Sequence, residues 1–582
     1  MRARAAAVAV LLAGAVALPV QAAAGTGAAA GAGGAVATAA VPDLAWEECG
    51  EDFGGGDGPA GTTFSCAWAE LPLDHADPGG ETIQVALKRL EARQPERKKG
   101  TLFLNPGGPG GSGVDFASVA WALFPRQVLN QFDVVGFDPR GVARSAPLVC
   151  FESFQQQQRV FGAAPAFPVD REEYRQLDRA LDRYTDLCQT QGGAIQDHMS
   201  TGDVARDLDL LRQAVGDEGL TYAGYSYGTQ LGSTYANLFP QNVRAVVVDG
   251  VLDPVAWTTG RGAADAALPF SSRLGSDQGA SDSLGQFFAL CAQAGPERCS
   301  LAAQGDPRAV YDATMAVLRE EPVRLDLGGG FVVEITYQDV VGASLGTFYS
   351  AYFWADLAAL VSEVAAAAGV ADPVAPPEGA QAERVAAFAG APMPQTLEGF
   401  DGVACSDSVN PTDRRAWWDA GRARDRVAPY FGSLWTWASG ACADWPGASE
   451  GAYRGPWTAR TASPVLVVGN TYDPATPYSG AQAVAGLLPG SRLLTVEGWG
   501  HTSLGYSTCA DQAVARYLVN GRLPAAGTRC AFDVRPFDDA LVLEPPAAAA
   551  RSGEVGTVDE RAAAIERARE IVSGQLPGAA GR

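Results

Sequence analysis

The sequence predicts an α/β fold in which a mostly parallel sheet carries helices on both faces and is interrupted by a large, mainly helical insertion. Between about residues 82 and 252, short apolar runs typical of strands alternate with stretches of helical spacing. The alternation stops over residues 253–455, where alanine-rich helical stretches dominate, and strand patterns return at 464–470 and 492–496. Strands that alternate with helices indicate a parallel sheet covered on both faces.

The first 40 residues have the composition of an export signal followed by a spacer. Arg2 and Arg4 precede a short apolar run, and small residues end it, so residues 1–22 are expected to be a signal peptide. Residues 23–40, almost all alanine and glycine, are expected to be a spacer or removable pro-segment. No later apolar run is long enough to cross a bilayer, so we expect a secreted, extracellular protein without a membrane span.

The cysteines and charges restrict the class of protein further. The chain has 10 cysteines, which fits an oxidising compartment, and a net charge of −23, which argues against nucleic acid as a partner. Its 3 histidines are widely spaced and form no His-Glu-x-x-His pattern, so we expect no metal site and no cofactor. Ten cysteines allow many connectivities, and pairing sequence neighbours is one hypothesis. Its five couples are Cys49–Cys66, Cys150–Cys188, Cys291–Cys299, Cys405–Cys442 and Cys509–Cys530.

The first part of the sheet domain is expected over residues 41–252. Ile83, Val85 and Leu87 lie on one face of a predicted strand, and two more strands are predicted at 100–104 and 132–138. Ser200 can cap a helix that runs to Val215 with its apolar residues near one face. These elements lead into the most informative stretch of the chain.

Residues 224–228 form a Gly-x-Ser-x-Gly pentapeptide at the point where a strand pattern becomes a helix pattern. A serine on such a sharp strand-to-helix turn has a strained backbone and an exposed hydroxyl. Glycines two residues away on each side are needed because side chains there would clash as strand and helix pass closely. Ser226 is therefore a candidate nucleophile.

A serine nucleophile needs a histidine base and a carboxylate that fixes the base's tautomer. His501 is the only histidine after Ser226, and it follows the predicted strand at 492–496. Asp473 ends the preceding predicted strand, and the order Ser, acid, His matches the order in α/β-hydrolases. We therefore predict Ser226, Asp473 and His501 as a catalytic triad. His75 and His198 lie upstream of the serine and are expected to be structural or exposed.

Acyl transfer also needs backbone donors for the developing oxyanion. One is expected to be the N–H of Tyr227, directly after the nucleophile. The other is expected from the glycine-rich loop 105–113, which follows a predicted strand and lacks the lysine of a phosphate-binding loop. Gly107 or Gly108 can supply it, and we prefer Gly108.

The second part of the sheet domain is expected over residues 456–535, where it supplies the strands before Asp473 and His501. Residues 536–582 form a C-terminal tail to which the sequence assigns no function. Within this tail, residues 558–572 have the pattern of a solvated helix.

Together these residues resemble the proline iminopeptidase branch of the α/β-hydrolases, and within it the secreted bacterial tripeptidyl aminopeptidases and their mycobacterial serine protease relatives. The matching segments cover most of the chain between about residues 45 and 530. They are Asn105–Gly113, Gly136–Gly141, Gly224–Gly228, Asp249–Pro254, Asp473–Pro477 and Gly500–His501. The resemblance departs at Pro106, where the branch usually has histidine, and at Ala143, where it usually has glycine.

The resemblance implies an α/β-hydrolase fold, the same triad, and a helical cap formed by the insertion at 253–455. It also implies that Thr476 supports the triad and that short peptides leave from free N-termini. An N-terminal exopeptidase must bind an ammonium group, which calls for carboxylates. Asp407 matches a Cys-x-Asp element of the branch and is the candidate substrate-binding residue, with Glu398 and Asp401 as weaker ones.

The sequence therefore predicts a secreted serine exopeptidase that releases short peptides, tripeptides in particular, through an acyl-enzyme. Its expected partners are peptide substrates with a free N-terminus, and we expect a monomer. The alternative is a secreted carboxylesterase or lipase-like hydrolase with the same triad, because a triad does not distinguish amides from esters. A non-catalytic binding protein on the same scaffold is a third hypothesis, but it would be marked by a missing triad member.

Overall fold

The structure is a computed structural model, and all of its described residues lie within Ala39–Arg582. The described residues are 39–56, 58–326, 332–373, 398–448, 450–538 and 556–573. The expected signal peptide at 1–22 and nearly all of the expected spacer at 23–40 lie outside this part of the chain. Part of the insertion, 374–397, and most of the C-terminal tail also lie outside it.

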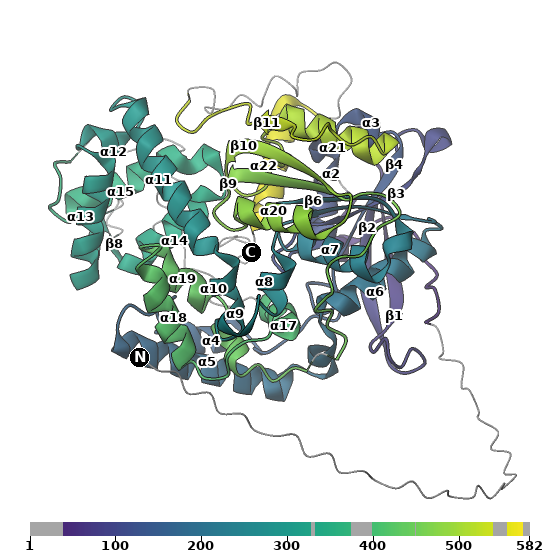
Figure 1. Ribbon diagram of the computed structural model, residues 1–582, viewed down its shortest axis with the longest axis horizontal. Helices are drawn as coiled ribbons and strands as arrows, with labels where there is room; N and C mark the ends of the chain where they lie inside the picture. The colour runs from purple at the N-terminus through teal and green to yellow at the C-terminus, as the bar shows by residue number, and fades with distance from the viewer. Residues whose placement is uncertain are drawn as a thin grey trace, which may run out of the picture. The chain divides into compact units, whose positions relative to one another are not determined.

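Within the described residues, nine strands form one sheet in the order β1-β2-β4-β3-β5-β6-β9-β10-β11 (Figure 1). Strands β1 and β2 pair antiparallel with each other, β2 pairs antiparallel with β4, and every pair from β4 to β11 is parallel. The strands are β1 Phe64–Pro72, β2 Thr82–Leu90, β3 Gly100–Asn105, β4 Phe132–Phe137, β5 Leu220–Tyr225, β6 Val243–Asp249, β9 Leu466–Tyr472, β10 Arg492–Trp499 and β11 Arg529–Ala531. This mostly parallel sheet confirms the predicted fold class.

The central strands are buried on both faces, which explains why they read as continuous apolar runs in the sequence. In β3, Phe103 belongs to one hydrophobic core, whereas Leu102 and Leu104 belong to a second core on the other face. In β6, Val246 and Val248 face the first core. Side chains alternate across a strand, so each run supplies both layers.

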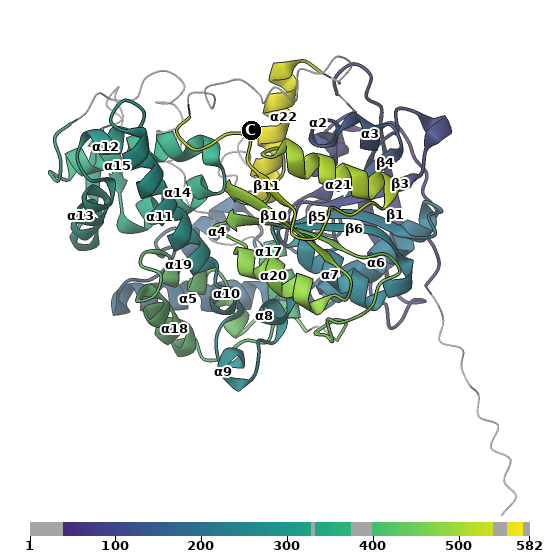
Figure 2. The same cartoon turned by 45° about the horizontal axis from the view of Figure 1, so that its top comes forward.

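Helices cover both faces of the sheet, as Figure 2 shows for α6, α7 and α20 on one side and α3 and α21 on the other. The helices of the sheet domain are α1 Gly113–Ser118, α2 Ala120–Leu123, α3 Arg126–Leu129, α6 Thr201–Ala214, α7 Gly228–Leu238, α20 Tyr478–Leu487, α21 Thr508–Asn520 and α22 Val558–Ser573. Ser200 accepts a hydrogen bond from the backbone N–H of Asp203 and caps α6, as the sequence predicts.

Strands β6 and β9 lie side by side although residues 250–465 separate them in the sequence. The described chain between them is mainly helical, as expected, but it also contains a hairpin that no sequence pattern indicated, β7 Val323–Asp326 and β8 Val332–Ile335. The helices are α8 Pro254–Thr258, α9 Ala263–Ala266, α10 Phe270–Leu274, α11 Ser276–Ala294, α12 Ser300–Ala303, α13 Pro307–Glu320, α14 Tyr337–Phe348, α15 Trp354–Ala367, α17 Glu398–Asp407, α18 Arg415–Asp425 and α19 Phe431–Trp437.

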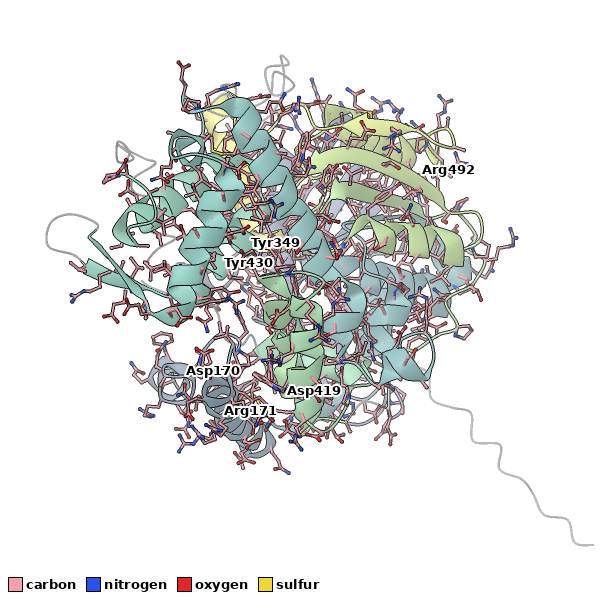
Figure 3. All side chains as sticks on the ribbon, turned by 60° about the vertical axis from the view of Figure 1, so that its left-hand side comes forward. Asp170, Arg171, Tyr349, Asp419, Tyr430 and Arg492 are labelled. Atoms are coloured by element: carbon pink, nitrogen blue, oxygen red, sulfur yellow. A yellow bond between two sulfur atoms is a disulfide. The ribbon has the colours of Figure 1, made fainter. Side chains whose placement is uncertain are left out.

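A second helical segment, between β4 and α6, packs against this insertion. It was not predicted from the sequence. It contains α4 Phe154–Phe161 and α5 Arg171–Gln191, and α5 begins at the cap Asp170, labelled beside Arg171 in Figure 3. Arg414 of the insertion forms ion pairs with Asp178 and Asp182 of α5. The segment expected to form the first part of the sheet domain, 41–252, therefore also contains helices that pack against the insertion at 253–455.

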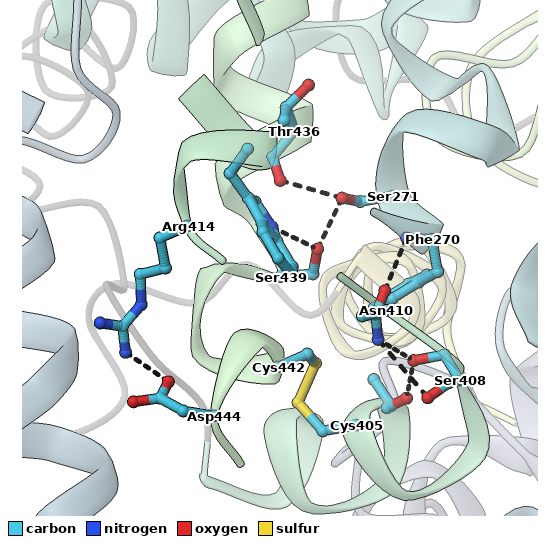
Figure 4. Close-up of a disulfide and its surroundings, with 12 residues drawn as sticks. Phe270, Ser271, Cys405, Ser408, Asn410, Arg414, Thr436, Ser439, Cys442 and Asp444 are labelled. Carbon is cyan, nitrogen blue, oxygen red and sulfur yellow. Dashed lines mark hydrogen bonds and ion pairs between the residues drawn. A yellow bond between two sulfur atoms is a disulfide. The ribbon is translucent and has the colours of Figure 1, made fainter. Parts of the chain in front are cut away.

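All five disulfides join the sequence neighbours that were predicted to pair. They are Cys49–Cys66, Cys150–Cys188, Cys291–Cys299, Cys405–Cys442 and Cys509–Cys530. Figure 4 shows Cys405–Cys442, which links α17 to the short helical turn Gly440–Ala443, with the ion pair of Arg414 and Asp444 nearby. In the described part of the chain, no helix is long and apolar enough to cross a membrane.

Helix α22 differs from the solvated helix that the tail sequence suggested. Ala564, Ala568 and Val572 are 8%, 0% and 3% exposed, and they belong to the second hydrophobic core. Their spacing of four residues places them on one face of the helix. This face contacts α1 and α2 of the sheet domain.

Candidate active site

Ser226 lies on a sharp turn between β5 and α7, as the Gly-x-Ser-x-Gly pattern predicts. Its φ is 54°, in the left-handed region that residues other than glycine rarely adopt. A Cβ added to Gly224 would lie 2.3 Å from the carbonyl oxygen of Gly228, and one added to Gly228 would lie 2.7 Å from that of Asn105. Both glycines are therefore required by the close approach of neighbouring backbone.

Asp473 and His501 are brought together at the ends of β9 and β10. Nδ1 of His501 lies 2.9 Å and 3.0 Å from the two carboxylate oxygens of Asp473, and the residues are 4% and 1% exposed. The carboxylate also accepts hydrogen bonds from the N–H groups of Ala475, Thr476 and Thr502 and from the hydroxyl of Thr476. These donors hold the carboxylate in place, and the carboxylate fixes the orientation of the imidazole.

The end of β6 connects the serine turn to this pair. The backbone N–H of Ser226 donates to the carbonyl oxygen of Asp249 at 3.0 Å. The next residue is Gly250, where an added Cβ would lie 3.3 Å from Cε1 of His501 and 3.2 Å from Oγ1 of Thr476. Ser226 and His501 therefore both lie next to the short backbone segment Asp249–Gly250.

The second imidazole nitrogen of His501 is the group available for proton transfer. Nε2 is buried and has no hydrogen-bond partner among the described residues, whereas Nδ1 is engaged by Asp473. A buried nitrogen without a partner is costly in a folded protein and is often functional. The arrangement leaves Nε2 free to accept a proton.

The glycine loop Asn105–Gly113 lies directly against the serine turn. A Cβ added to Gly107 would lie 2.5 Å from the carbonyl oxygen of Tyr225, 2.8 Å from Cβ of Ser226 and 2.9 Å from the backbone nitrogen of Tyr227. The backbone N–H of Gly107 donates to Oδ1 of Asn105 at 3.0 Å. The N–H groups of Gly108 and Tyr227 have no acceptor among the described residues. They form the candidate pair of oxyanion donors.

The insertion reaches the candidate triad through Tyr349, which Figure 3 labels. Its ring packs edge-on against the imidazole of His501 with 5.0 Å between centroids, and its carbonyl oxygen accepts a hydrogen bond from the N–H of His501 at 2.9 Å. Helix α11 approaches from another side, since a Cβ added to Gly279 would lie 2.5 Å from the carbonyl oxygen of Asp473. Residues that sequence patterns did not single out therefore cover the acid and the base.

Asp407, the expected substrate-binding residue, is buried and fully engaged. It is 1% exposed, and its carboxylate accepts hydrogen bonds from the N–H and hydroxyl of Thr201 and from the indole of Trp257. Burial raises the pKa of Asp407 to about 6. The Thr201 hydroxyl also bonds the Tyr227 hydroxyl at 2.6 Å. Asp407 thus joins α17 to α6 and α8 and has no exposed oxygen for a substrate amine.

The other two acidic candidates lie in the first turn of α17, which approaches the glycine loop. A Cβ added to Gly110 would lie 3.2 Å from the backbone nitrogen of Phe400. Oε1 of Glu398 accepts hydrogen bonds from the N–H groups of Cys150 and Phe151 at 2.6 and 3.0 Å. Asp401 is 3% exposed, and burial raises its pKa to about 7. Of the three, Glu398 is the least buried.

Asp249 has no role in the predicted site, although it lies in segment 249–254, which carries part of the family resemblance. Its carboxylate accepts hydrogen bonds from the N–H and hydroxyl of Ser503, at 3.1 and 2.7 Å. Burial, with a smaller contribution from the charge of Asp473, raises the pKa of Asp249 to about 7. A strand-end aspartate next to a glycine was the available signal.

The imidazole of His75 has a structural role, as expected. Nε2 of His75 lies 2.9 Å from Asp207, whose carboxylate is also bound by the buried guanidinium of Arg140. Arg140 further donates to the carbonyl oxygen of His198 at 3.2 Å. In the described residues, no group of three or more His, Cys, Asp or Glu side chains could hold a metal ion.

Comparison with known proteins places these features in a wider group. Residues 100–290 match the family described as "alpha/beta hydrolase fold", and residues 428–530 match the one described as "TAP-like protein". The chain is 32% identical to the tripeptidyl aminopeptidase of Streptomyces lividans over 86% of this chain and 89% of that protein. It is 32% identical to serine protease Hip1 of Mycobacterium tuberculosis over 80% and 87%. It is also 31% identical to carboxylesterase B of the same species over 85% and 91%.

Proposed function

We propose a specific peptidase activity for this chain, which belongs to the family of TAP-like α/β-hydrolases and is a serine hydrolase. The proposed protein is exported and releases short peptides, tripeptides in particular, from free N-termini. Its nucleophile is Ser226, its base is His501 and its acid is Asp473. The observation that carries the proposal is the buried Asp473–His501 pair, whose Nε2 has no hydrogen-bond partner among the described residues and whose imidazole lies beside Gly250. The strained Ser226 turn is hydrogen-bonded to Asp249, the residue before Gly250.

The first half of the reaction forms an acyl-enzyme. Nε2 of His501 takes the hydroxyl proton of Ser226 as Oγ attacks the carbonyl carbon of the scissile peptide bond. Asp473 stabilises the imidazolium through Nδ1 and does not itself take the proton. The N–H groups of Gly108 and Tyr227 donate to the oxyanion of the tetrahedral intermediate. His501 then gives its proton to the leaving amine, and the C–N bond breaks.

The second half reverses these roles with water as the nucleophile. His501 takes a proton from water, the resulting hydroxide attacks the acyl carbon, and the same two N–H groups stabilise the oxyanion. The proton returns to Oγ of Ser226 as the ester bond breaks, and the short peptide leaves with a carboxylic acid group that then releases its proton to solvent. Thr476 supports both halves, because its hydroxyl donates to Asp473 at 2.9 Å and lies 3.3 Å from Nδ1 of His501.

Two further observations support the finer parts of the proposal. Five disulfides and the signal-like residues 1–22 fit export to an oxidising compartment. For the free amine, Glu398 replaces Asp407 as the candidate carboxylate, because α17 begins beside the glycine loop and Asp407 is enclosed. A cap that covers the acid and base also limits access to short chain ends.

The decisive test compares free and blocked peptides. We expect the secreted form of the chain to cleave a chromogenic tripeptide with a free amine and to lose about 10²-fold or more in kcat/KM when the amine is acetylated, because an ammonium–carboxylate contact is lost. Ser226→Ala should remove hydrolysis of both, since no other residue replaces the nucleophile. Equal cleavage of free and acetylated peptides would exclude the exopeptidase assignment, and activity in Ser226→Ala would exclude the triad.

The relative named carboxylesterase B favours a second candidate, a carboxylesterase with the same triad. An esterase needs no amine site and hydrolyses short acyl esters faster than any peptide. Measuring kcat/KM for a p-nitrophenyl ester beside the tripeptide substrate distinguishes the two candidates. A higher value for the ester, with no dependence of peptide cleavage on the amine, would favour the esterase.

A further inference from the structure

The C-terminal helix α22 lies beside the parts of the sheet domain that carry the candidate active site. Figures 1 and 2 both place it next to α2, and it also contacts α1, the helix that follows the glycine loop. At its start, a Cβ added to Gly556 would lie 2.9 Å from the ring of Trp121. Neither the predicted triad nor the matched TAP-like segment, residues 428–530, includes this helix.

Arg569 connects α22 to the loop that follows His501. Its side chain is 9% exposed, and its guanidinium donates to the carbonyl oxygen of Gly505 at 2.8 Å and to Glu566 at 3.0 Å. The guanidinium also lies 3.8 Å from the ring centroid of Tyr506 and 4.6 Å from that of Tyr352. A buried guanidinium that is both stacked and hydrogen-bonded fixes the groups around it.

Tyr506, which the guanidinium of Arg569 contacts, also contacts two other parts of the chain. Its ring stacks on Phe532 with 4.5 Å between centroids, and its hydroxyl donates to the hydroxyl of Ser350 at 2.8 Å. Ser350 in turn pairs through the backbone with Gly500, the residue before His501. The loop 500–506 is therefore held at its start by the insertion and at its end by Arg569.

The backbone of this loop needs such support. Thr502 has a φ of 64°, a strained value for a β-branched residue, while its N–H donates to Asp473 at 3.2 Å. Gly505 also has a positive φ, of 69°, and an added Cβ there would lie 2.8 Å from Cγ2 of Ile565 in α22. Strained conformations persist only where the surroundings enforce them.

We propose that α22 positions the loop that carries His501 and that Arg569 is the positioning residue. This inference rests on the proposed function, because it assumes that His501 is the base. The helix acts through the loop: it keeps Nε2 of His501 at the place from which it reaches Ser226. A displacement of about 1 Å in such a group can cost on the order of 10²-fold in rate.

The test uses the full-length protein with a free-amine tripeptide substrate. Arg569→Gln should lower kcat by about tenfold to 10²-fold while KM changes less than about threefold, because substrate binding is retained and the base is displaced. Arg569→Lys keeps one cation and a donor, so it should recover most of the loss. Arg567→Gln is the matched control, since Arg567 is exposed on the same helix. Its kcat should equal that of the unchanged protein.

All rates are measured well below the lowest melting temperature of the set, so that a folding defect is not mistaken for a slow step. A kcat for Arg569→Gln within about twofold of the Arg567→Gln value would overturn the inference, and so would a rise in KM at unchanged kcat. If Arg569→Gln does not fold, Ile565→Ala tests the positioning role of α22 instead. It removes the contact with Gly505 and should lower kcat about threefold to tenfold, whereas an unchanged kcat would overturn the inference.

Other results would contradict the proposed function rather than the role of α22. In that case the unchanged protein does not cleave the substrate, or Ser226→Ala retains cleavage. A different result is that the unchanged protein cleaves the substrate and Ser226→Ala abolishes cleavage, while Arg569→Gln and Ile565→Ala leave kcat unchanged. That result would support the triad and contradict the role of α22.

Discussion

At Gly107 the glycine loop comes closest to the serine turn, and its substitution gives a sharp prediction. An alanine Cβ would lie 2.5 Å from the carbonyl oxygen of Tyr225 and 2.8 Å from Cβ of Ser226. Gly107→Ala should therefore push the loop away from the turn, misplace the Gly108 donor and lower kcat by about 10²-fold or more. Steady-state kinetics with the tripeptide substrate measure this loss.

A matched control separates this collision from backbone strain. Gly61 has a φ of +89°, similar to the +102° of Gly107, but an added Cβ there meets nothing within 4 Å. Gly61→Ala should cost about 1 kcal/mol of stability from its positive φ and leave kcat unchanged. Similar losses of kcat in both variants would show that strain alone, and not the contact with the turn, matters at Gly107.

Single residues could be predicted where the chemistry fixes their order along the chain. The triad hypothesis of Ser226, Asp473 and His501 came from a pentapeptide, a strand end and the only downstream histidine. The burial of Asp407 could not be predicted, because a Cys-x-Asp pattern gives the residue type but not the direction in which its side chain points. The pattern also contains no information about Thr201 and Trp257, the groups that enclose this carboxylate.

At the scale of elements, Asp407 fastens α17 to α6 and α8. Asp407→Ala should leave the N–H of Thr201 and the indole of Trp257 without their acceptor and lower the free energy of unfolding by about 2–4 kcal/mol. Thermal or denaturant unfolding measures the loss. KM for the free-amine tripeptide should stay within about twofold of its original value, because Asp407 does not reach the surface.

Asp419 provides the control, since it is an exposed aspartate on α18 and is labelled in Figure 3. Asp419→Ala should change stability by less than about 0.5 kcal/mol. A large rise in KM for Asp407→Ala with unchanged stability would instead return Asp407 to the role of substrate contact.

The elements themselves differed in how far the sequence determined them. The parallel strands were predicted because their two buried faces leave continuous apolar runs between turns. Helix α22 was placed in solvent because most of its residues are charged or alanine, although Ala564, Ala568 and Val572 form an apolar stripe. A stripe shows that a helix can be buried on one side, but the partner, here α1 and α2, is a property of the folded chain.

For the whole molecule, buried carboxyl groups predict how stability depends on pH. Burial raises the pKa of Asp401 to about 7, whereas an aspartate in the unfolded chain titrates near 4. Between these values the folded protein binds more protons than the unfolded one, so stability is greatest below about pH 4 for this group and falls as pH rises to about 7. Asp249, with a pKa raised to about 7, acts in the same direction.

We therefore expect the melting temperature to be a few degrees higher at pH 5 than at pH 8. Asp401→Asn is neutral at every pH and should make this difference smaller. Calorimetry at several pH values, in buffers of equal ionic strength, provides the measurement. A melting temperature that rises from pH 5 to pH 8, or an identical slope in Asp401→Asn, would contradict the assignment of a buried, protonated Asp401.

The disulfides have a consequence for how the chain is made. Their sequence separations run from 8 to 38 residues, and no bond encloses or crosses another. Each cysteine's correct partner is thus the next cysteine to be synthesised or the one just before it. A chain that emerges from its amino end can close every bond before the following couple appears. The order of emergence is enough to select one connectivity, with no need for later exchange between wrongly joined sulfurs.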